Sequence, residues 1–217
     1  MKKLIVSATT REVKPLLNHA EKKTEHLLEL TPHTDILITG IGIFQTIYLM
    51  MNHLNNNHYD QLINVGIAGS YLPEIKVGTV VEIVSDTFGD FGIDDNGQFI
   101  TVWDAPLLDK NTFPFEYGWL NNPKRVDMII PQVKGITVQK TSGSLPLIEE
   151  RKNRFSPGVE TMESAAFFYV ALQKKIPFVA IRSISNMVEP RNKENWHIDL
   201  AVENLNKTLL KNNILID

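Results

Sequence analysis

Two polar segments of the chain lie at element boundaries, where α/β proteins commonly keep their chemistry. Glu163 begins an apolar run that is typical of a buried helix and extends to Gln173. Asn186 follows an apolar run that is typical of a buried strand and begins at Phe178. In α/β proteins, ligands bind outside the carboxyl ends of the strands, beside the starts of the following helices. A carboxylate and an amide at these positions could act on one polar ligand together.

Glu163 has two interpretations. A carboxylate in the first turn of a helix is stabilised by the helix dipole, which would be a structural role. The helix that follows is apolar on nearly all sides, however, so the carboxylate lies at a partly buried edge and needs hydrogen-bond donors. The two hydroxyls of a ribose would supply them. Glu160, three residues earlier, faces elsewhere and is interpreted as structural.

Glu12 and Arg182 present the same choice between structure and function. Glu12 follows the first expected strand at the start of a helix, where it could stabilise the helix dipole or act as a general base. Arg182 lies inside an apolar strand, and a buried arginine needs an anion or an acceptor. It could form a structural ion pair or contact a ligand. Strand alternation places Arg182 and Asn186 on one face of the strand, with Ser183 and Ser185 on the other.

Two glycine segments follow expected strands, Gly40–Gly42 and Gly66–Gly69. Glycine lets backbone amides approach a ligand closely, and it also marks tight turns. Neither segment matches a dinucleotide-binding fingerprint or a phosphate-binding P-loop. The segments alone leave a ligand cradle and simple turns both open.

The composition excludes several classes of function. Of the 217 residues, 43% are hydrophobic and 22% are charged, which is ordinary for a soluble globular domain. The net charge of -3 offers no basic field for a nucleic acid, and the absence of cysteine excludes disulfides and thiol nucleophiles. The six histidines lack metal-ligand spacing, so we interpret them as surface or packing residues.

The sequence also bears on localisation. The segment Met1–Val6 begins basic and becomes apolar, but the apolar run stops at Ser7, too soon for a signal peptide. No run approaches the ~20 apolar residues of a membrane span. We therefore expect a soluble cytoplasmic protein without a membrane partner.

Apolar runs with strand and helix character alternate along the chain. This pattern is typical of a largely parallel sheet covered on both faces. We expect a single three-layer α/β domain over residues 1–217, with a mixed, mostly parallel sheet flanked by helices. The expected strands cover 4–8, 27–30, 35–39, 62–65, 79–84, 136–140 and 178–184, with a hairpin turn at 95–97. The expected helices cover 11–21, 42–54, 147–154, 164–173 and 194–211.

From Leu4 to about Leu210, the chain resembles the nucleoside phosphorylase and nucleosidase superfamily. Four segments carry the resemblance, in the same order and at strand ends: Ala8–Val13, Asn64–Gly69, Met162–Glu163 and Arg182–Asn186. The resemblance implies this fold and a purine nucleoside as substrate. It implies that Glu12 activates water, that Glu163 holds the ribose hydroxyls and that Asn186 stabilises the departing purine. Further substrate contacts are implied for Ala68, Gly69, Met162 and Arg182.

Within the superfamily, the chain resembles the futalosine hydrolases through Thr161–Ala166, Ser185–Arg191 and the insertion Asp86–Phe99. This subgroup implies hydrolysis of futalosine to hypoxanthine and dehypoxanthine futalosine in menaquinone biosynthesis, a reaction for which we expect neither a metal nor an organic cofactor. The alternatives are an adenine nucleosidase acting on methylthioadenosine or S-adenosylhomocysteine, a purine nucleoside phosphorylase, and a nucleoside-binding protein without activity.

Several positions bear on these alternatives. Adenine nucleosidases of the superfamily carry an aspartate where this chain has Asn186 and a serine where it has Ile67. Hexameric phosphorylases carry an arginine at the position of Asn64, so phosphate would lack its usual partner here. Retention of both Glu12 and Glu163 argues against a mere binding protein. The NH₂ group of Asn186 can donate to N7 and O6 of hypoxanthine, which predicts a preference for 6-oxopurines.

Two further expectations concern assembly and substrate closure. The helix over 42–54 carries more apolar residues than one core-facing stripe needs, which predicts a homodimer or larger homo-oligomer. Superfamily members often complete each site with a loop of the partner, and Phe88–Trp103 is the candidate loop here. Trp196 lies in a charged segment after Pro190, where it could form a lid over the 5′ substituent or simply dock the last helix.

Overall fold

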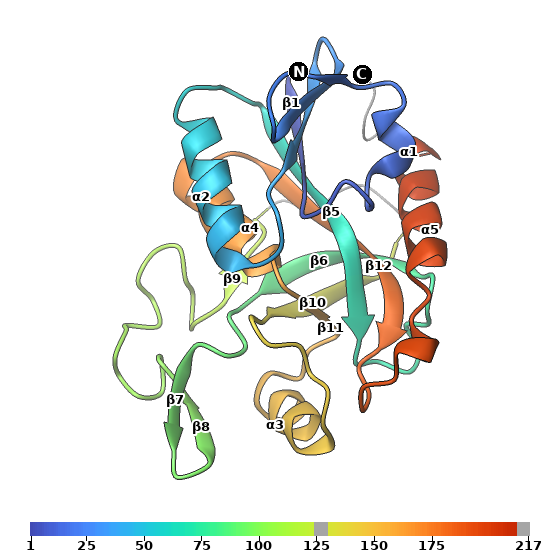
Figure 1. The fold of residues 1–217 in the computed structure, drawn as a ribbon. Helices are drawn as coiled ribbons and strands as arrows, with labels where there is room; N and C mark the ends of the chain where they lie inside the picture. Colours follow the sequence, from blue (N-terminus) through green and yellow to red (C-terminus); the bar gives the residue numbers. More distant parts are fainter. Residues whose placement is uncertain (124–129, 212–217) are drawn as a thin grey trace.

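A sheet of mixed direction forms the middle of the molecule in the computed structural model, which describes residues 1–123 and 130–211 (Figure 1). Its central strands are β4 (Thr34–Ile38), β1 (Lys3–Ser7), β5 (Gln61–Ser70) and β12 (Phe178–Met187), and neighbours among them are parallel. These strands are buried over most of their length, which is why their sequences are continuous apolar runs.

Helices cover both faces of this sheet (Figure 1). One face packs against α2 (Ile43–Leu54) and α4 (Ser164–Lys174), and the other against α1 (Lys14–Leu17) and α5 (Ile198–Lys211). The α4 helix is buried on nearly every side, as its apolar sequence predicts. Two apolar clusters, one on each face of the sheet, therefore hold a three-layer α/β arrangement together, which confirms the expected fold class.

The other half of the sheet closes on itself. The strand β6 (Val80–Asp86) runs antiparallel to β12, and β10 (Gln132–Thr137) and β11 (Val159–Thr161) follow it in parallel. The last of these, β11, pairs antiparallel with the end of β5, where residues 159–160 meet residues 69–70. This closure brings the segment after β11 to the carboxyl ends of the central strands.

A hairpin projects from this body (Figure 1). It consists of β7 (Gly92–Asp95) and β8 (Gln98–Thr101), joined at Asn96 and Gly97. Both turn residues have positive φ angles, 54° and 87°, as a two-residue turn that matches the strand twist requires. The expected hairpin is therefore confirmed. The remaining elements are β2 (Glu21–Lys22), β3 (Leu27–Thr31), β9 (Leu120–Asn121), α3 (Leu145–Phe155) and the short 3₁₀ helix η1 (Lys193–Asn195).

Some expected element bounds are wrong. The helix expected over 11–21 is limited to α1, because the preceding turn folds the Glu12 carboxylate back onto the end of β1. The glycine segment 66–69 is not a turn but continues β5, since β12 and β11 pair with it from either side. The last helix begins at Ile198, after η1 and an extended residue at Trp196. The strand expected over 136–140 is β10, which ends at Thr137.

Candidate active site

A cavity of about 360 Å³ lies at the carboxyl ends of β1, β5 and β12, beside the start of α4. Ligand sites in proteins commonly have this size and this position in an α/β sheet. The closure of the sheet through β11 supplies one wall, and the segment before α5 supplies another. The expected site residues that line the cavity are Glu12, Ala68, Gly69, Met162, Glu163, Asn186 and Trp196.

Glu12 is held by donors on both carboxylate oxygens. Its Oε2 accepts hydrogen bonds from the backbone N–H of Thr9 at 2.9 Å and from the hydroxyls of Ser7 and Thr9, both at 3.1 Å. Its Oε1 accepts one, from the backbone N–H of Ile67 at 3.1 Å. A carboxylate oxygen has two lone pairs, so Oε1 retains capacity for a ligand proton.

The position of the Glu12 carboxylate explains why residue 66 is a glycine. A Cβ atom at Gly66 would come within 2.7 Å of Glu12 Oε1, closer than Cβ atoms approach other atoms in proteins. Glycine at this position therefore lets the carboxylate lie against β5 and reach the amide of Ile67. The serine that adenine nucleosidases carry at the Ile67 position would make the same contact, because the donor is a backbone N–H.

Glu163 precedes α4 but does not cap it with its side chain. Instead, Oε1 accepts a hydrogen bond of 3.0 Å from the backbone N–H of Gly42, in the turn before α2. Burial raises the pKa of the Glu163 carboxyl, against the lowering effects of the Gly42 N–H and of Arg182, and nearby Glu12 raises it further. The carboxylate is thus fixed at the cavity edge by a distant segment, rather than by its own helix as a purely local role would require.

Arg182 does not line the cavity. Its guanidinium lies one layer below, where Nη1 donates to the carbonyl of Ile181 at 2.9 Å and Nη2 donates to Ser164 Oγ at 2.9 Å and to Asn64 Oδ1. The side chain is 1% exposed, and burial lowers its pKa while the carboxylates of Glu163, Glu12 and Asp86 raise it. The position favours an electrostatic role beneath the two cavity glutamates over direct contact with a ligand.

Asn186 and Ser185 both line the cavity, so the expected simple alternation along β12 is wrong. The register of β12 against β5 shifts between Ile184 and Asn186, and this irregularity turns two consecutive side chains toward one site. Ser185 Oγ donates to Asn186 Oδ1 at 2.8 Å, and Asn186 Nδ2 donates to the carbonyl of Met187 at 2.9 Å. The amide therefore keeps one N–H and one lone pair for a ligand.

Glu160 is the centre of a buried network of polar contacts behind the cavity, which the sequence did not predict. Glu160 forms an ion pair with Arg151 at 3.1 Å and accepts from the hydroxyl of Tyr71 at 2.7 Å. It also accepts from the N–H and hydroxyl of Ser142, at 2.8 and 2.6 Å, and so fixes the cavity wall after β10. The structural interpretation of Glu160 agrees with these contacts. Arg151 gave no signal in the sequence, because it lies in a polar helix and its burial depends on tertiary packing.

Two features are absent from the part of the chain that the structure describes. None of its helices has the length and apolar character that crossing a bilayer requires. Within residues 1–123 and 130–211, no three His, Asp or Glu side chains come together in a way that could hold a metal ion.

The chain is similar to known proteins in sequence and in fold. The futalosine hydrolase of Streptomyces coelicolor is 27% identical over 155 residues, which cover 69% of this chain and 63% of that protein. The methylthioadenosine/S-adenosylhomocysteine nucleosidase of Maridesulfovibrio salexigens is 28% identical over 206 residues, 87% of each chain. The native futalosine hydrolase structure of Helicobacter pylori superposes with a TM-score of 0.79 at 14% identity, covering 96% of both chains, and so has the same fold. The family model described as the phosphorylase superfamily matches residues 2–216, and the chain therefore belongs to this superfamily.

Proposed function

We propose that this protein is a purine nucleosidase, which hydrolyses the bond between a purine and the ribose C1′. The observation that carries the proposal is the arrangement of Glu12, Glu163 and Asn186 around one cavity of nucleoside size. Each group retains hydrogen-bonding capacity toward the cavity or its edge. A base for water, an acceptor for a diol and an amide for a purine are the three functions that glycosidic hydrolysis needs.

The contacts of Glu12 support its role as the general base. Water that donates to the remaining lone pair of Oε1 would lie beside β5, at the wall of the cavity. Glu12 takes a proton from this water as C1′ acquires oxocarbenium character. The donors on Oε2 keep the carboxylate oriented while the charge develops. The water oxygen forms the new C1′–O bond as the C1′–N9 bond breaks. The electron pair of that bond leaves with the purine, which is protonated as Glu12 gives up the proton that it took.

Glu163 supplies orientation and Asn186 supplies leaving-group stabilisation. The Glu163 carboxylate would accept from the ribose 2′ and 3′ hydroxyls, while the N–H of Gly42 prevents it from turning away. The remaining N–H of Asn186 would donate to N7, where negative charge builds as the glycosidic bond breaks. Ordered binding of both ends of the nucleoside converts binding free energy into orientation at C1′.

Water is favoured over phosphate as the nucleophile by Asn64. This residue stands where hexameric phosphorylases carry a phosphate-binding arginine, and its side chain is buried and hydrogen-bonded inside the protein. Its Nδ2 donates to the carbonyl of Val6 at 3.0 Å, and its Oδ1 accepts from Arg182. A phosphate dianion beside Glu12 would also meet a like charge. The reaction is therefore proposed as hydrolysis.

Futalosine is the proposed substrate, with hypoxanthine and dehypoxanthine futalosine as products in menaquinone biosynthesis. This assignment is supported by the segments 161–166 and 185–191 and by the similarity to the Streptomyces coelicolor protein. The base edge is less selective than the sequence alone predicts. Ser185 uses one lone pair of Asn186 Oδ1 and Met187 uses one N–H, so the free N–H can donate to N7 of either purine, while the free lone pair can accept from a 6-amino group.

Methylthioadenosine/S-adenosylhomocysteine hydrolysis is therefore the second candidate. The observation in its favour is this donor–acceptor pair on Asn186, which complements N7 and the amino group of adenine. The similarity to the Maridesulfovibrio salexigens nucleosidase points the same way. Discrimination between the two candidates then depends on the 5′ end of the nucleoside.

One incubation series tests the proposed function. Futalosine, methylthioadenosine and inosine are each incubated with the protein, with and without inorganic phosphate, and released base is measured by chromatography. We expect hypoxanthine from futalosine at a rate that is independent of phosphate. Base release that requires phosphate would identify a phosphorylase, and higher kcat/KM on methylthioadenosine would identify the second candidate. No release from any nucleoside would contradict the enzyme assignment.

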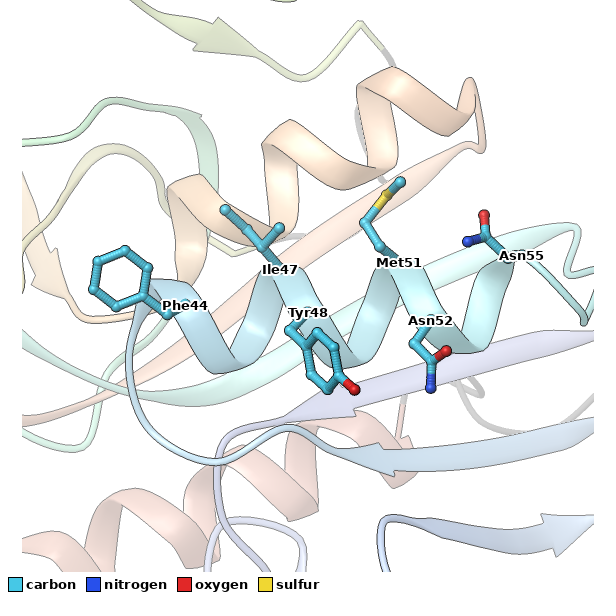
Figure 2. Close-up of a pocket in the computed structure, with 6 residues that line it drawn as sticks. All are labelled: Phe44, Ile47, Tyr48, Met51, Asn52 and Asn55. Carbon is cyan, nitrogen blue, oxygen red and sulfur yellow. The ribbon is translucent and has the colours of Figure 1, made fainter.

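We also propose that two copies of the chain form a homodimer through α2. Phe44 and Tyr48 are 77% and 66% exposed on this helix. Figure 2 shows them along one side of α2 with Ile47 and Met51, on a surface groove that also includes Asn52 and Asn55. Burying this surface against an identical helix would remove large apolar side chains from water.

The proposed dimer would also complete the active site. Ile41 immediately precedes the turn that holds Glu163, lines the cavity and is exposed. A partner on α2 would therefore lie beside an open cavity wall. The hairpin over 92–101, within the segment Phe88–Trp103, projects away from the body and is the proposed loop that reaches the partner's site (Figure 1).

Sedimentation velocity tests the dimer. We expect the wild type to sediment as a dimer at micromolar concentration and Phe44→Asp to sediment as a monomer with reduced kcat/KM. Leu210→Asp is the matched control, because Leu210 is an exposed apolar residue on α5, which packs on the opposite face of the sheet. A wild type that sediments as a monomer would refute the proposal.

A further inference from the structure

A second cavity opens beside the candidate active site. Its volume is about 410 Å³, and it shares Arg11, Trp196 and Ile198 with the first cavity. The other lining residues are Arg191, Lys193 and Asp199. The two cavities therefore meet along the segment that joins the end of β12 to the start of α5.

The second cavity carries a positive charge in an acidic protein. Three cations and one carboxylate line it, which leaves an excess of positive charge, whereas the whole chain has a net charge of -3. The start of α5 at Ile198 adds the partial positive charge of a long helix. The electrostatic potential of this cavity therefore favours an anion, although the net charge of the chain is negative.

The cations of this cavity are only partly neutralised by the protein. Arg11 Nη2 contacts Asp199 Oδ1 at 2.7 Å, in an exposed ion pair that solvent screens. Arg191 lies over the ring of Trp196, with its guanidinium carbon 5.4 Å from the ring centroid. Among the described residues, neither Arg191 nor Lys193 forms an ion pair.

The geometry of the proposed substrate determines what would enter this cavity. A nucleoside has three groups that extend from its ribose: the base, the 2′,3′ diol and the 5′ substituent. If Asn186 holds the base and Glu163 holds the diol, the 5′ substituent is the group left to extend along Trp196. The second cavity adjoins the first along this residue.

We propose that the second cavity is a subsite for a carboxylate at the far end of the 5′ substituent of the nucleoside, with Arg191 and Lys193 as its cationic partners. Trp196 would cover the apolar part of the substituent and hold the Arg191 guanidinium over its ring. The subsite rests on the proposed nucleosidase function, because it assumes the same placement of ribose and base. It makes the 5′ carboxylate, rather than the base edge, the main determinant of substrate choice.

A pair of substrates that differ only in charge tests this subsite. The probes are 5′-deoxy-5′-(3-carboxypropylthio)inosine and its primary carboxamide, compared by kcat/KM. Each exposed ion pair contributes up to about a fivefold preference, so two pairs predict a several-fold preference for the carboxylate, up to about 25-fold. The preference should decrease as salt concentration rises, because the ion pairs face solvent.

Variants of Arg191 and Lys193 test whether these residues cause the preference for the carboxylate. Lys193→Gln should lower kcat/KM for the carboxylate several-fold more than kcat/KM for the carboxamide, and Arg191→Gln with Lys193→Gln should remove the preference. Lys207→Gln is the matched control, because it removes an exposed lysine from the outer face of α5. Equal kcat/KM for the two probes in the wild type would overturn the subsite. An equal loss on both probes in Lys193→Gln would also overturn it, since Lys193 would then act on folding or on the ring of Trp196.

Binding measurements separate failure of the subsite from failure of the proposed function. Calorimetry with Glu12→Gln measures the affinity for both probes without turnover. Tighter binding of the carboxylate, lost in the double variant, would support the subsite even if no probe were hydrolysed by the wild type. Equal affinity together with rapid hydrolysis of both probes would refute the subsite and leave the nucleosidase proposal standing.

Discussion

Replacement of Glu12 by glutamine removes the proposed base and also disturbs its hydrogen bonds. The carboxylate accepts from the backbone N–H of Thr9 on one oxygen and from the backbone N–H of Ile67 on the other. A glutamine can present its oxygen to only one of these donors. Its NH₂ group then faces the second N–H, which cannot turn to accept. One buried donor left unsatisfied costs about 1–3 kcal/mol of folding stability.

The catalytic loss should be larger than the loss of stability. Removal of a general base lowers kcat by about 10²–10⁴-fold, while ground-state binding should change by less than about tenfold. The stability cost corresponds to a decrease in Tm of roughly 2–4 °C for each kcal/mol in a chain of this size. Base release gives kcat, calorimetry gives the affinity for substrate, and thermal unfolding gives Tm.

Glu160→Gln is the matched control for this experiment. Glu160 is a second buried glutamate at the same cavity, and its oxygens also accept several hydrogen bonds. We expect a decrease in Tm at least as large, because buried Arg151 loses its carboxylate partner. We expect kcat to stay within about tenfold of the wild type, because Glu160 has no proposed role in proton transfer. The assignment of the base is refuted if Glu12→Gln, while folded, retains turnover close to that of the wild type. It is also refuted if both variants lose activity equally.

Three further predictions concern other buried or cavity-lining groups. Glu163→Ala should raise KM and lower kcat/KM by about 10–100-fold, because it removes the acceptor for the ribose hydroxyls. The wild type should lose activity at low pH for the same reason, since burial raises the pKa of this carboxyl and protonation removes its acceptor. Steady-state kinetics check this, because removal of the 2′ or 3′ hydroxyl from the substrate should cost less activity in the variant than in the wild type. Asn186→Asp should raise the relative kcat/KM on adenine nucleosides and make it fall with rising pH, because only a protonated carboxyl can deliver a proton to N7; a pH series on methylthioadenosine measures the effect, and an unchanged preference would contradict it. Burial raises the pKa of Asp86 to about 8, so this neutral carboxyl favours the folded state below the unfolded pKa of about 4, and that stability is lost as the pH rises toward 8. Asp86→Asn should therefore flatten the decrease in the free energy of unfolding between pH 4 and 8, by at most about 1.4 kcal/mol per pH unit in urea titrations, and an unchanged slope would show that Asp86 is ionised in the folded protein.

The candidate catalytic residues could be found in the sequence because they lie at the ends of strongly patterned elements. The apolar runs of β5, β12 and α4 predict a sheet covered on both faces, and parallel strands bring their carboxyl ends to one side. Glu12, Glu163 and Asn186 each lie at such an end. Their placement around one cavity therefore follows from local patterns together with the rule for ligand sites in α/β proteins.

Other features depended on pairings that no local pattern encodes. The register shift in β12 turns Ser185 and Asn186 toward the same cavity, whereas a regular strand would separate them. Arg182 is drawn below the cavity by acceptors on Asn64 and Ser164, which lie 118 and 18 residues away in the chain. The burial of Arg151 likewise depends on Glu160 and on packing of α3.

By itself, the sequence determined the fold class, the hairpin turn and the residue types of the proposed chemistry, since these depend on periodicity and on the preferences of single residues. Only the tertiary structure decided how Glu163 is held, because its partner is the backbone of Gly42 in the turn before α2. Only the tertiary structure placed Arg11 beside Arg191 and Lys193, on segments from opposite ends of the chain, to form the second cavity. Hydrogen bonds, buried charges and cavities form between surfaces that meet only on folding, and their geometry depends on long-range packing rather than on the spacing of residues along the chain.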